Sequence, residues 1–302
     1  MTARPPIVIT GPTGWIGLAM LACLSRQSDD WADRIRLFGS SERDVEAIDG
    51  TVLPMQSLDA LQPADLDDAI VIHLAYLTKE KVDLLGERRF TDTNLAIDDV
   101  VLSALAGAKP RSVFVASSGA AMLAAQGRDR HPYGLTKLRQ EDRFAAWAVA
   151  THTPLIIGRI FNLAGPYINK VDSYAIGSFV NQAKRFGAIK INAEVPVFRS
   201  YLHVDDLCAL ILGAGQAAVG RPAPIDLCGA ETVEMSDTAL AVAQHLGGGI
   251  AVARGPVDWA QPKAYLGDFT DTKILAMELN LPLAPFSTQV ADTVRWIEQT
   301  GL

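Results

Sequence analysis

Tyr133 and Lys137 stand four residues apart in a helix-forming stretch of the sequence. This spacing puts both side chains on one face of a helix, where they can interact. A free tyrosine has a pKa of about 10, which is too high for easy proton exchange at neutral pH. A neighbouring ammonium favours the phenolate and lowers that pKa. We therefore expect the pair to pass a proton to or from a substrate oxygen.

A tyrosine and a lysine at this spacing also occur by chance on amphipathic helices, so a third residue carries the argument. The segment Ala116-Ser117-Ser118-Gly119 follows a predicted strand at residues 112–116. Ligands bind at the carboxyl ends of strands in parallel sheets, and a serine there can hydrogen-bond the reacting oxygen. We assign this role to Ser118 and expect Ser117 to cap a helix or to pack.

The elements that must position these residues are short apolar strands alternating with helices. Strands are predicted at residues 7–10, 35–38, 51–54, 69–73, 112–116 and 155–159, and helices at 15–26, within 79–107 and at 133–150. Continuous apolar strands separated by helices indicate a parallel sheet covered on both faces. The sequence therefore predicts an α/β fold with a Rossmann-type, doubly wound parallel sheet.

Beyond about residue 166 this alternation breaks. Glycine, proline and polar residues become frequent there, and the elements shorten. We expect a smaller, mixed α/β substrate-binding domain that is interleaved with the first. The predicted nucleotide-binding domain covers residues 1–165 and roughly 200–228, and the predicted substrate-binding domain covers 166–199 and 229–302.

A glycine-rich turn joins the first predicted strand to the first predicted helix. Its glycines recur every third residue, and a turn that approaches a pyrophosphate needs residues without a Cβ atom. The helix that follows offers N–H groups and a partial positive charge. Its place after the first strand favours nucleotide binding over a plain connection. The expected cofactor contacts are Gly11, Thr13, Gly14, Trp15, Ile16 and Gly17.

The residues after the second predicted strand bear on the identity of the cofactor. An acidic residue at this place accepts hydrogen bonds from the ribose of NAD and repels the 2′-phosphate of NADP. Here Ser40, Ser41 and Arg43 offer two hydroxyls and a guanidinium, which suit a phosphate. Glu42 and Asp44 could turn inward and favour NAD instead. We expect NADP(H) to be preferred over NAD(H).

With these motifs in view, the chain resembles the extended short-chain dehydrogenase/reductase family of nucleotide-sugar epimerases, dehydratases and ketoreductases. The segments that carry the resemblance are His73-Leu74-Ala75, Asn94, the R-x-F-N-x-x-G-P match at 159–166 and the R-x-[YF]-x-x-V-x-D match at 199–206. The resemblance implies that Leu74, Ala75, Asn94, Lys137 and Phe161 lie at the cofactor. It also implies that Asn162 faces the substrate and that Arg199 contacts a nucleotide-sugar diphosphate.

The resemblance favours carbonyl reduction, or its reverse, at C4 of a nucleoside-diphosphate deoxysugar. Ser118 and Tyr133 would hold the carbonyl oxygen, Tyr133 would donate the proton, and Lys137 would hold the nicotinamide ribose. The family's dehydratases carry an Asp-Glu pair after the catalytic hydroxyl, whereas Gly119 and Ala120 stand there in this chain, so dehydration is disfavoured.

Three alternatives to this reductase stay open. One is a C4 epimerase that retains its cofactor, and another is a reductase of a small ketone or aldehyde. Outside enzymes, the alternative is an NADP(H)-sensing regulator on the same fold. Such regulators commonly lack the tyrosine, so Tyr133 argues against that function.

Composition narrows the class further. The net charge of −7 disfavours nucleic acid or an anionic membrane as the main partner. Cys23, Cys208 and Cys228 fit neither a disulfide framework nor a metal site. We read no signal peptide and no membrane span, which makes the cytoplasm the expected location. The resemblance implies a homodimer that pairs through helices near 95–107 and 138–150.

Overall fold

The computed structural model describes residues 4–301, which fall into two compact units. The first unit runs to Ile160 and resumes at Cys208–Asp226. The second unit comprises Phe161–Leu207 and the chain from Leu227 onward. The two units are therefore interleaved along the sequence.

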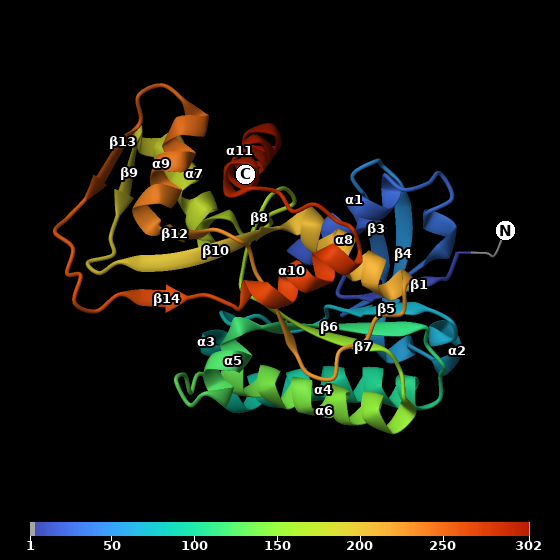
Figure 1. Ribbon diagram of the computed structural model, residues 1–302. Helices are drawn as coiled ribbons and strands as arrows, with labels where there is room; N and C mark the ends of the chain where they lie inside the picture. Colours follow the sequence, from blue (N-terminus) through green and yellow to red (C-terminus); the bar gives the residue numbers. More distant parts are fainter. Residues whose placement is uncertain (1–3, 302) are drawn as a thin grey trace. The chain divides into compact units, whose positions relative to one another are not determined.

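The first unit is built on an eight-stranded sheet with the order β11-β7-β6-β5-β1-β2-β4-β3 (Figure 1). The strands are β1 (Ile7–Thr10), β2 (Ile35–Gly39), β3 (Arg43–Glu46), β4 (Val52–Ser57), β5 (Ile70–His73), β6 (Ser112–Ser118), β7 (Leu155–Ile160) and β11 (Ile225–Leu227). β1 pairs in parallel with both β2 and β5, and β6 and β7 continue the parallel pairing. The predicted doubly wound sheet is confirmed, and its strand order reverses at β1, where such sheets bind ligands.

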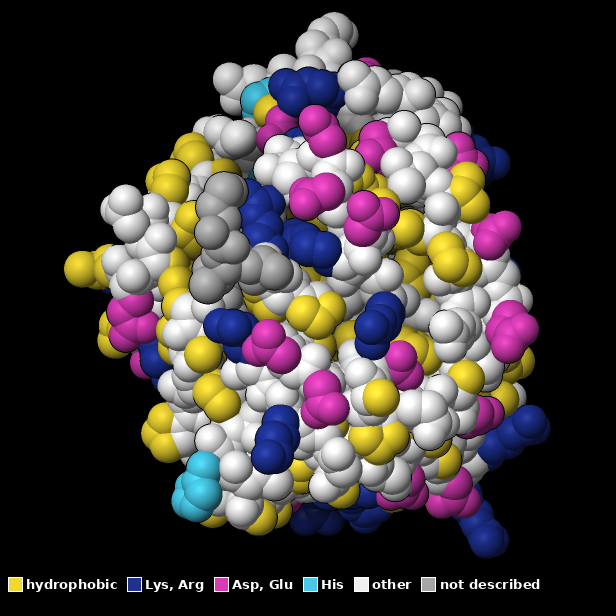
Figure 2. All heavy atoms as spheres, turned by 90° about the vertical axis from the view of Figure 1, so that its right-hand side faces the viewer, with side chains coloured by type: hydrophobic (Ala, Val, Ile, Leu, Met, Phe, Trp, Pro, Cys, Tyr) yellow, Lys and Arg dark blue, Asp and Glu magenta, His cyan; other side chains and the backbone are white. Residues whose placement is uncertain are grey.

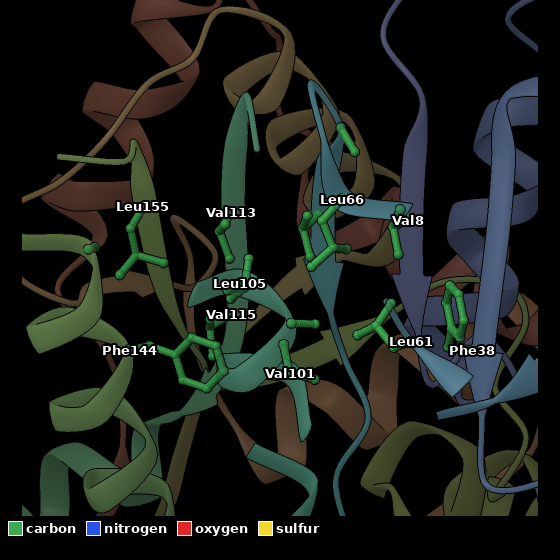
Figure 3. Packing of buried hydrophobic residues seen from close by; sticks show 14 of the residues in the cluster. Val8, Phe38, Leu61, Leu66, Val101, Leu105, Val113, Val115, Phe144 and Leu155 are labelled. Atoms are coloured by element: carbon green, nitrogen blue, oxygen red, sulfur yellow. The ribbon is translucent and has the colours of Figure 1, made fainter. Parts of the chain in front are cut away.

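Helices cover both faces of this sheet. On one face, α4 (Glu87–Ala106) and α6 (Pro132–Thr151) run side by side. Val8, Val113 and Leu155 of the sheet pack with Leu105 and Phe144 of these helices (Figure 3). Successive strand residues point to opposite faces, so Ile7 and Ile9, on either side of Val8, point away from this cluster.

The opposite face is covered by α1 (Trp15–Ser25) and by the part of α8 (Val204–Gln216) that belongs to the first unit. Gly215 of α8 lies so close to the sheet that a Cβ atom there would stand 2.5 Å from Ile70. The remaining α-helices of the first unit are α2 (Pro63–Leu66), α3 (Lys81–Leu85) and α5 (Gly119–Ala125).

The second unit is mixed α/β, as predicted. β10 (Val197–His203) pairs in parallel with β8 (Asn162–Ala164) and β14 (Lys263–Tyr265), and antiparallel with β12 (Thr232–Glu234). A separate pair joins β9 (Ala188–Ile191) to β13 (Ala251–Arg254). The helices wholly within this unit are α7 (Ala175–Phe186), α9 (Met235–Leu246), α10 (Phe269–Glu278) and α11 (Phe286–Thr300).

Two stretches of the first unit differ from the sequence-based expectation. The strand expected at residues 51–54 is β4, and it pairs antiparallel with β3, which was not predicted. Gly50, with φ of 82°, lies in the turn between β3 and β4. The helix expected within 79–107 is broken by Gly86, whose φ of 77° separates α3 from α4. Such φ values favour glycine, which has no Cβ atom to clash.

The start of α8 also differs. The sequence predicts a helix that starts at Leu207 with Asp205 and Asp206 as its caps, whereas the helix begins at Val204 and both residues lie in its first turn. Their carboxylates still suit the place, because the N-terminal end of a helix carries a partial positive charge.

Hydropathy and surface charge bear on what the described residues can contact. Within residues 4–301, no helix combines the length and the apolar character needed to cross a membrane. On the face drawn in Figure 2, basic and acidic side chains are interspersed. That face therefore presents mixed charge, and not the broad basic field that a polyanion would require.

Candidate functional site

The three residues predicted to do the chemistry come from two elements of the first unit. Ser118 is the last residue of β6, and Tyr133 and Lys137 lie in the first two turns of α6. Gly134 lets α6 approach the chain just after Ser118, because a Cβ atom on it would stand 2.6 Å from the Ala120 carbonyl oxygen. A larger residue at this position would push the two elements apart.

The first turn of α6 is fixed by local contacts. His131 is its N-cap residue, and the His131 Nδ1 atom accepts a hydrogen bond from the Tyr133 backbone N–H at 3.2 Å. Pro132 follows at the first helical position, where its fixed φ favours a helix start. His131 thus holds the start of α6 through the backbone N–H of Tyr133.

Lys137 is buried, with 4% of its surface exposed. Its Nζ atom donates hydrogen bonds to the Ala116 carbonyl oxygen at 2.6 Å and to Gln140 Oε1 at 2.9 Å. The same nitrogen lies 3.5 Å from the centroid of the Tyr76 ring, in a cation–π contact. These contacts tie the amine to β6 two residues before Ser118.

Burial sets the charge state of this amine. It lowers the pKa of Lys137 to about 7, while the negative charges of Asp98 and Glu141 favour the ammonium and limit that fall. At neutral pH the amine is therefore close to its titration midpoint.

Tyr76 is a candidate site residue that the sequence analysis missed. Its ring meets the ring of Tyr133 edge-on, with centroids 6.1 Å apart, while its face receives Lys137. Within the described residues, its hydroxyl is buried and has no hydrogen-bond partner. Burial raises the pKa of Tyr76, so its hydroxyl stays protonated. A signal did exist, because Tyr76 directly follows the His73-Leu74-Ala75 motif.

The two serines at the end of β6 have different surroundings. Ser117 donates to Glu141 Oε1 at 2.5 Å, and Glu141 is paired with Arg159 at 2.6 Å, so Ser117 packs inside a buried polar cluster. Ser118 Oγ accepts from the Ala120 N–H at 3.2 Å and so caps α5. The expected packing of Ser117 is confirmed, and the cap belongs to Ser118.

The glycine-rich turn has the shape that a dinucleotide pyrophosphate requires. Gly11 has a φ of 72°, and a Cβ atom on it would stand 2.7 Å from Ala75 N. A Cβ atom on Gly17 would stand 2.4 Å from the Pro12 carbonyl oxygen. Gly14 is exposed and is the N-cap of α1, and as a glycine it has no side chain with which to cap the helix. The N-terminal end of a helix favours a bound anion, because its N–H groups and partial positive charge face outward.

The other predicted cofactor residues of the first unit lie after β1, β2 and β5. Trp15 is 6% exposed and packs in the core. Arg43 begins β3 and is exposed. Of the rest, Thr13, Ile16, Leu74 and Ala75 are partly exposed, and Ser40 and Ser41 are exposed.

Asn94 supports the loop after β5. It is fully buried, its Oδ1 atom accepts from the Leu77 N–H at 2.8 Å, and its Nδ2 atom donates to the Phe90 carbonyl oxygen at 3.1 Å. Both ends of the amide are thus bonded to main chain, which holds the segment that carries Tyr76.

Three further predicted residues belong to the second unit. The Phe161 ring lies 5.0 Å from the Tyr265 ring, and the Arg199 guanidinium lies 5.7 Å from that same ring. Arg199 also donates to the carbonyl oxygen of the preceding residue at 2.8 Å. The Asn162 amide donates to a main-chain carbonyl of β10 at 3.1 Å. Among the residues that the structure describes, Arg199 contacts a carbonyl oxygen and a ring, and neither carries a charge that would neutralise the guanidinium.

Gly11→Ala is expected to weaken both the fold and nucleotide binding. A left-handed φ costs an alanine about 1–2 kcal/mol, and the collision with Ala75 adds roughly 1–3 kcal/mol. The matched control is Gly50→Ala, because Gly50 has a φ of 82° but no atom within 4 Å of a new Cβ. Urea unfolding and NADPH titration would check this, and equal losses in the two variants would contradict a close approach at Gly11.

Comparisons with known proteins agree with this geometry. The NAD dependent epimerase/dehydratase family matches residues 7–226. A dTDP-L-rhamnose 4-epimerase from Burkholderia thailandensis is 25% identical over 296 residues, which cover 80% of this chain and 81% of that protein.

Solved structures share the fold. The UDP-N-acetylglucosamine 4-epimerase from Methanobrevibacter ruminantium M1, in complex with UDP-N-acetylmuramic acid, superimposes with a TM-score of 0.79 at 16% identity, over 99% of this chain and 100% of its own. RMD from Pseudomonas aeruginosa, complexed with NADPH, gives a TM-score of 0.74 at 20% identity, over 98% of this chain and 99% of its own.

The family match begins at β1 and ends at Asp226, where the first unit ends. It confirms the resemblance inferred from the motifs. This chain belongs to the NAD-dependent epimerase/dehydratase family.

Proposed function

We propose that the protein is an NAD(P)(H)-dependent oxidoreductase that reduces a keto group at C4 of a nucleoside-diphosphate sugar. The observation that carries this proposal is the meeting of β6 and α6, which brings a buried lysine amine and the start of the Tyr133 helix to the strand end at Ser118. The proposed chemistry needs the side chains of Ser118, Tyr133 and Lys137 at one strand end.

In the proposed reaction, NADPH would, when bound, supply the hydride for the carbonyl carbon. Tyr133 donates its hydroxyl proton to the carbonyl oxygen, so that the ketone becomes an alcohol. The hydroxyl of Ser118 donates a hydrogen bond to the same oxygen and orients it. Lys137, as an ammonium, favours the phenolate that remains on Tyr133. The N-terminus of α1 would hold the cofactor pyrophosphate.

We further propose that NADP(H) binds more tightly than NAD(H). The exposed Ser40, Ser41 and Arg43 after β2 support this preference, because hydroxyls and a guanidinium hydrogen-bond a 2′-phosphate. Fluorescence titration with NADPH and NADH is the test, and tighter binding of NADH would exclude the preference.

The second unit is proposed to bind the substrate, with Arg199 on the diphosphate. Arg199→Ala should raise KM for a nucleotide-sugar by about 10- to 100-fold, since a charged hydrogen bond contributes about 1.5–3 kcal/mol. KM for a small ketone without a diphosphate should stay nearly unchanged. The control is Arg185→Ala, an exposed arginine in the last turn of α7. Equal effects on both substrates would exclude the nucleotide-sugar.

A second candidate function is C4 epimerisation with a retained cofactor. Two of the compared proteins are named as 4-epimerases, which favours it. The same three residues would serve both reactions. The deciding experiment mixes the purified protein with NADPH and a nucleoside-diphosphate 4-keto-6-deoxysugar. Stoichiometric consumption of NADPH supports the reductase, whereas tightly held NAD(H) and interconversion of C4 epimers without added cofactor support the epimerase.

The family resemblance also supports a homodimer. α4 and α6 would form the interface, because they lie side by side on one face of the first unit and Val149 near the end of α6 is 74% exposed. Sedimentation of the wild type as a monomer at micromolar concentration would exclude this proposal.

A further inference from the structure

A chain of buried polar groups lies beneath Lys137 in the first unit. Gln140 Nε2 donates to Asp98 Oδ1 at 2.6 Å, and Gln140 Oε1 accepts from Lys137 Nζ at 2.9 Å. Asp98, on α4, is fully buried, and Gln140, on α6, is 1% exposed. The carboxylate is therefore linked to the amine through one amide.

The chemistry of the three groups fixes the orientation of that amide. An ammonium can only donate hydrogen bonds, and a carboxylate can only accept them. The oxygen of Gln140 must therefore face Lys137, and its nitrogen must face Asp98. If the carboxylate is removed, nothing on that side compels the amide to present its oxygen to the amine.

His73 supports Asp98 from β5. The Thr10 hydroxyl oxygen accepts from the N–H groups of Leu74 and Ala75, both at 3.2 Å, so its proton is directed to His73 Nδ1 at 2.7 Å. This leaves His73 Nε2 to donate to Asp98 Oδ1 at 3.3 Å. The carboxylate is thus bonded to the end of β5, which is itself bonded to Thr10 at the end of β1, next to the glycine-rich turn.

A buried carboxylate is costly unless it is well paired, so Asp98 is a poor choice for packing alone. Its nearest cation, Arg143 Nη1, lies 3.8 Å from Oδ2. We propose that Asp98 is a positioning residue for the catalytic lysine, acting through Gln140 to hold the Lys137 ammonium at the end of β6. This inference rests on the proposed function, in which Lys137 works beside Tyr133.

The charges around Lys137 give the proposal a measurable consequence. The groups that face the amine or its partners are Asp98 on α4, Glu141 and Tyr133 on α6, His73 at the end of β5, Tyr76 in the loop after β5, Arg143 beside Asp98 and Arg159 beside Glu141. Of these, the negative charge of Asp98 raises the pKa of Lys137 more than that of Glu141 does. Removing it should make the amine lose its proton at lower pH.

The first test needs no cofactor or substrate. Lysine labelled with ¹³C at Cε is titrated by NMR in the free protein, and the Lys137 signal is identified by its absence from Lys137→Arg. Asp98→Asn should lower the titration midpoint by about half a unit to one unit. The control, Asp99→Asn, removes the same charge from a neighbouring, 63% exposed residue that also binds Arg143. It should leave the midpoint in place, and an unshifted Asp98→Asn would overturn the proposal.

The second test measures turnover as a function of pH. Asp98→Asn should lower kcat about tenfold with little change in KM. The alkaline limb of its pH–activity profile should also lie at lower pH than that of the wild type. Gln140→Met keeps the volume but breaks the link, so it should lower kcat to the same degree and decides the matter if Asp98→Asn fails to fold. Wild-type kcat and pH profile in Gln140→Met would overturn the proposal. An absence of turnover with any nucleotide-sugar would instead overturn the proposed function, and the NMR result would stand.

Discussion

Replacing Tyr133 with phenylalanine is expected to lower kcat by about 10²- to 10⁴-fold. The variant keeps the ring that packs against Tyr76 but loses the only hydroxyl proposed to donate a proton to the carbonyl oxygen. Dissociation constants for NADPH should stay within about threefold of the wild-type value, because the glycine-rich turn is untouched. Steady-state kinetics and fluorescence titration of the same samples would measure both quantities.

The control for this change is Tyr174→Phe, which removes the same atom from a 38% exposed tyrosine at the N-cap of α7. Its kcat should match that of the wild type. A Tyr133→Phe protein that turns over within a factor of about ten of the wild type would exclude Tyr133 as the proton donor.

Replacing Lys137 with methionine is expected to remove most activity and to change how stability depends on pH. In the folded protein burial lowers the pKa of Lys137 from 10.5 to about 7, so the unfolded chain holds more protons between these values. Wild-type stability should therefore rise with pH across this window, and the cost of burying the ammonium is greatest below about pH 7. At about 1.4 kcal/mol per unit, this cost is roughly 5 kcal/mol.

Methionine does not titrate, so the variant lacks this rise. On going from pH 10.5 down to pH 6, the wild type should lose about 5 kcal/mol of unfolding free energy relative to Lys137→Met. Urea unfolding at several pH values measures this difference. Lys109→Met, at an exposed lysine of the same unit, provides the control and should show no such change. A constant difference across the window would show that burial does not lower the pKa of Lys137.

Much of the fold could be predicted because the strands around β1 are buried on both faces. Such strands are continuous apolar runs, and the pattern alone located β1, β2, β5, β6 and β7. Of the β3–β4 hairpin, the sequence predicted only β4. In β3, Arg43, Asp44 and Glu46 are exposed and only Val45 is buried. A short edge strand of this composition has the same pattern as a solvated loop.

The sequence predicted some residues of the candidate site and missed others. The sequence could indicate Ser118, Tyr133 and Lys137, because their residue types and spacing carry chemistry. Asp98 and Gln140 were missed, because single charged or polar residues on helices are normally solvated. A faint signal existed, since Asp98 lies on the same helical stripe as Val101 and Leu105, at spacings of three and seven residues. Only the packing of α4 against α6 shows that this stripe is buried.

The account depends on Tyr133 and Lys137 acting as one unit, and the kcat of the double variant Tyr133→Phe/Lys137→Met tests this most directly. Residues that work together show strongly non-additive losses. We predict that the double variant turns over at about the rate of Tyr133→Phe alone, because the ammonium has no phenol left to act on. If the two losses instead multiply, the residues act independently and the account is contradicted.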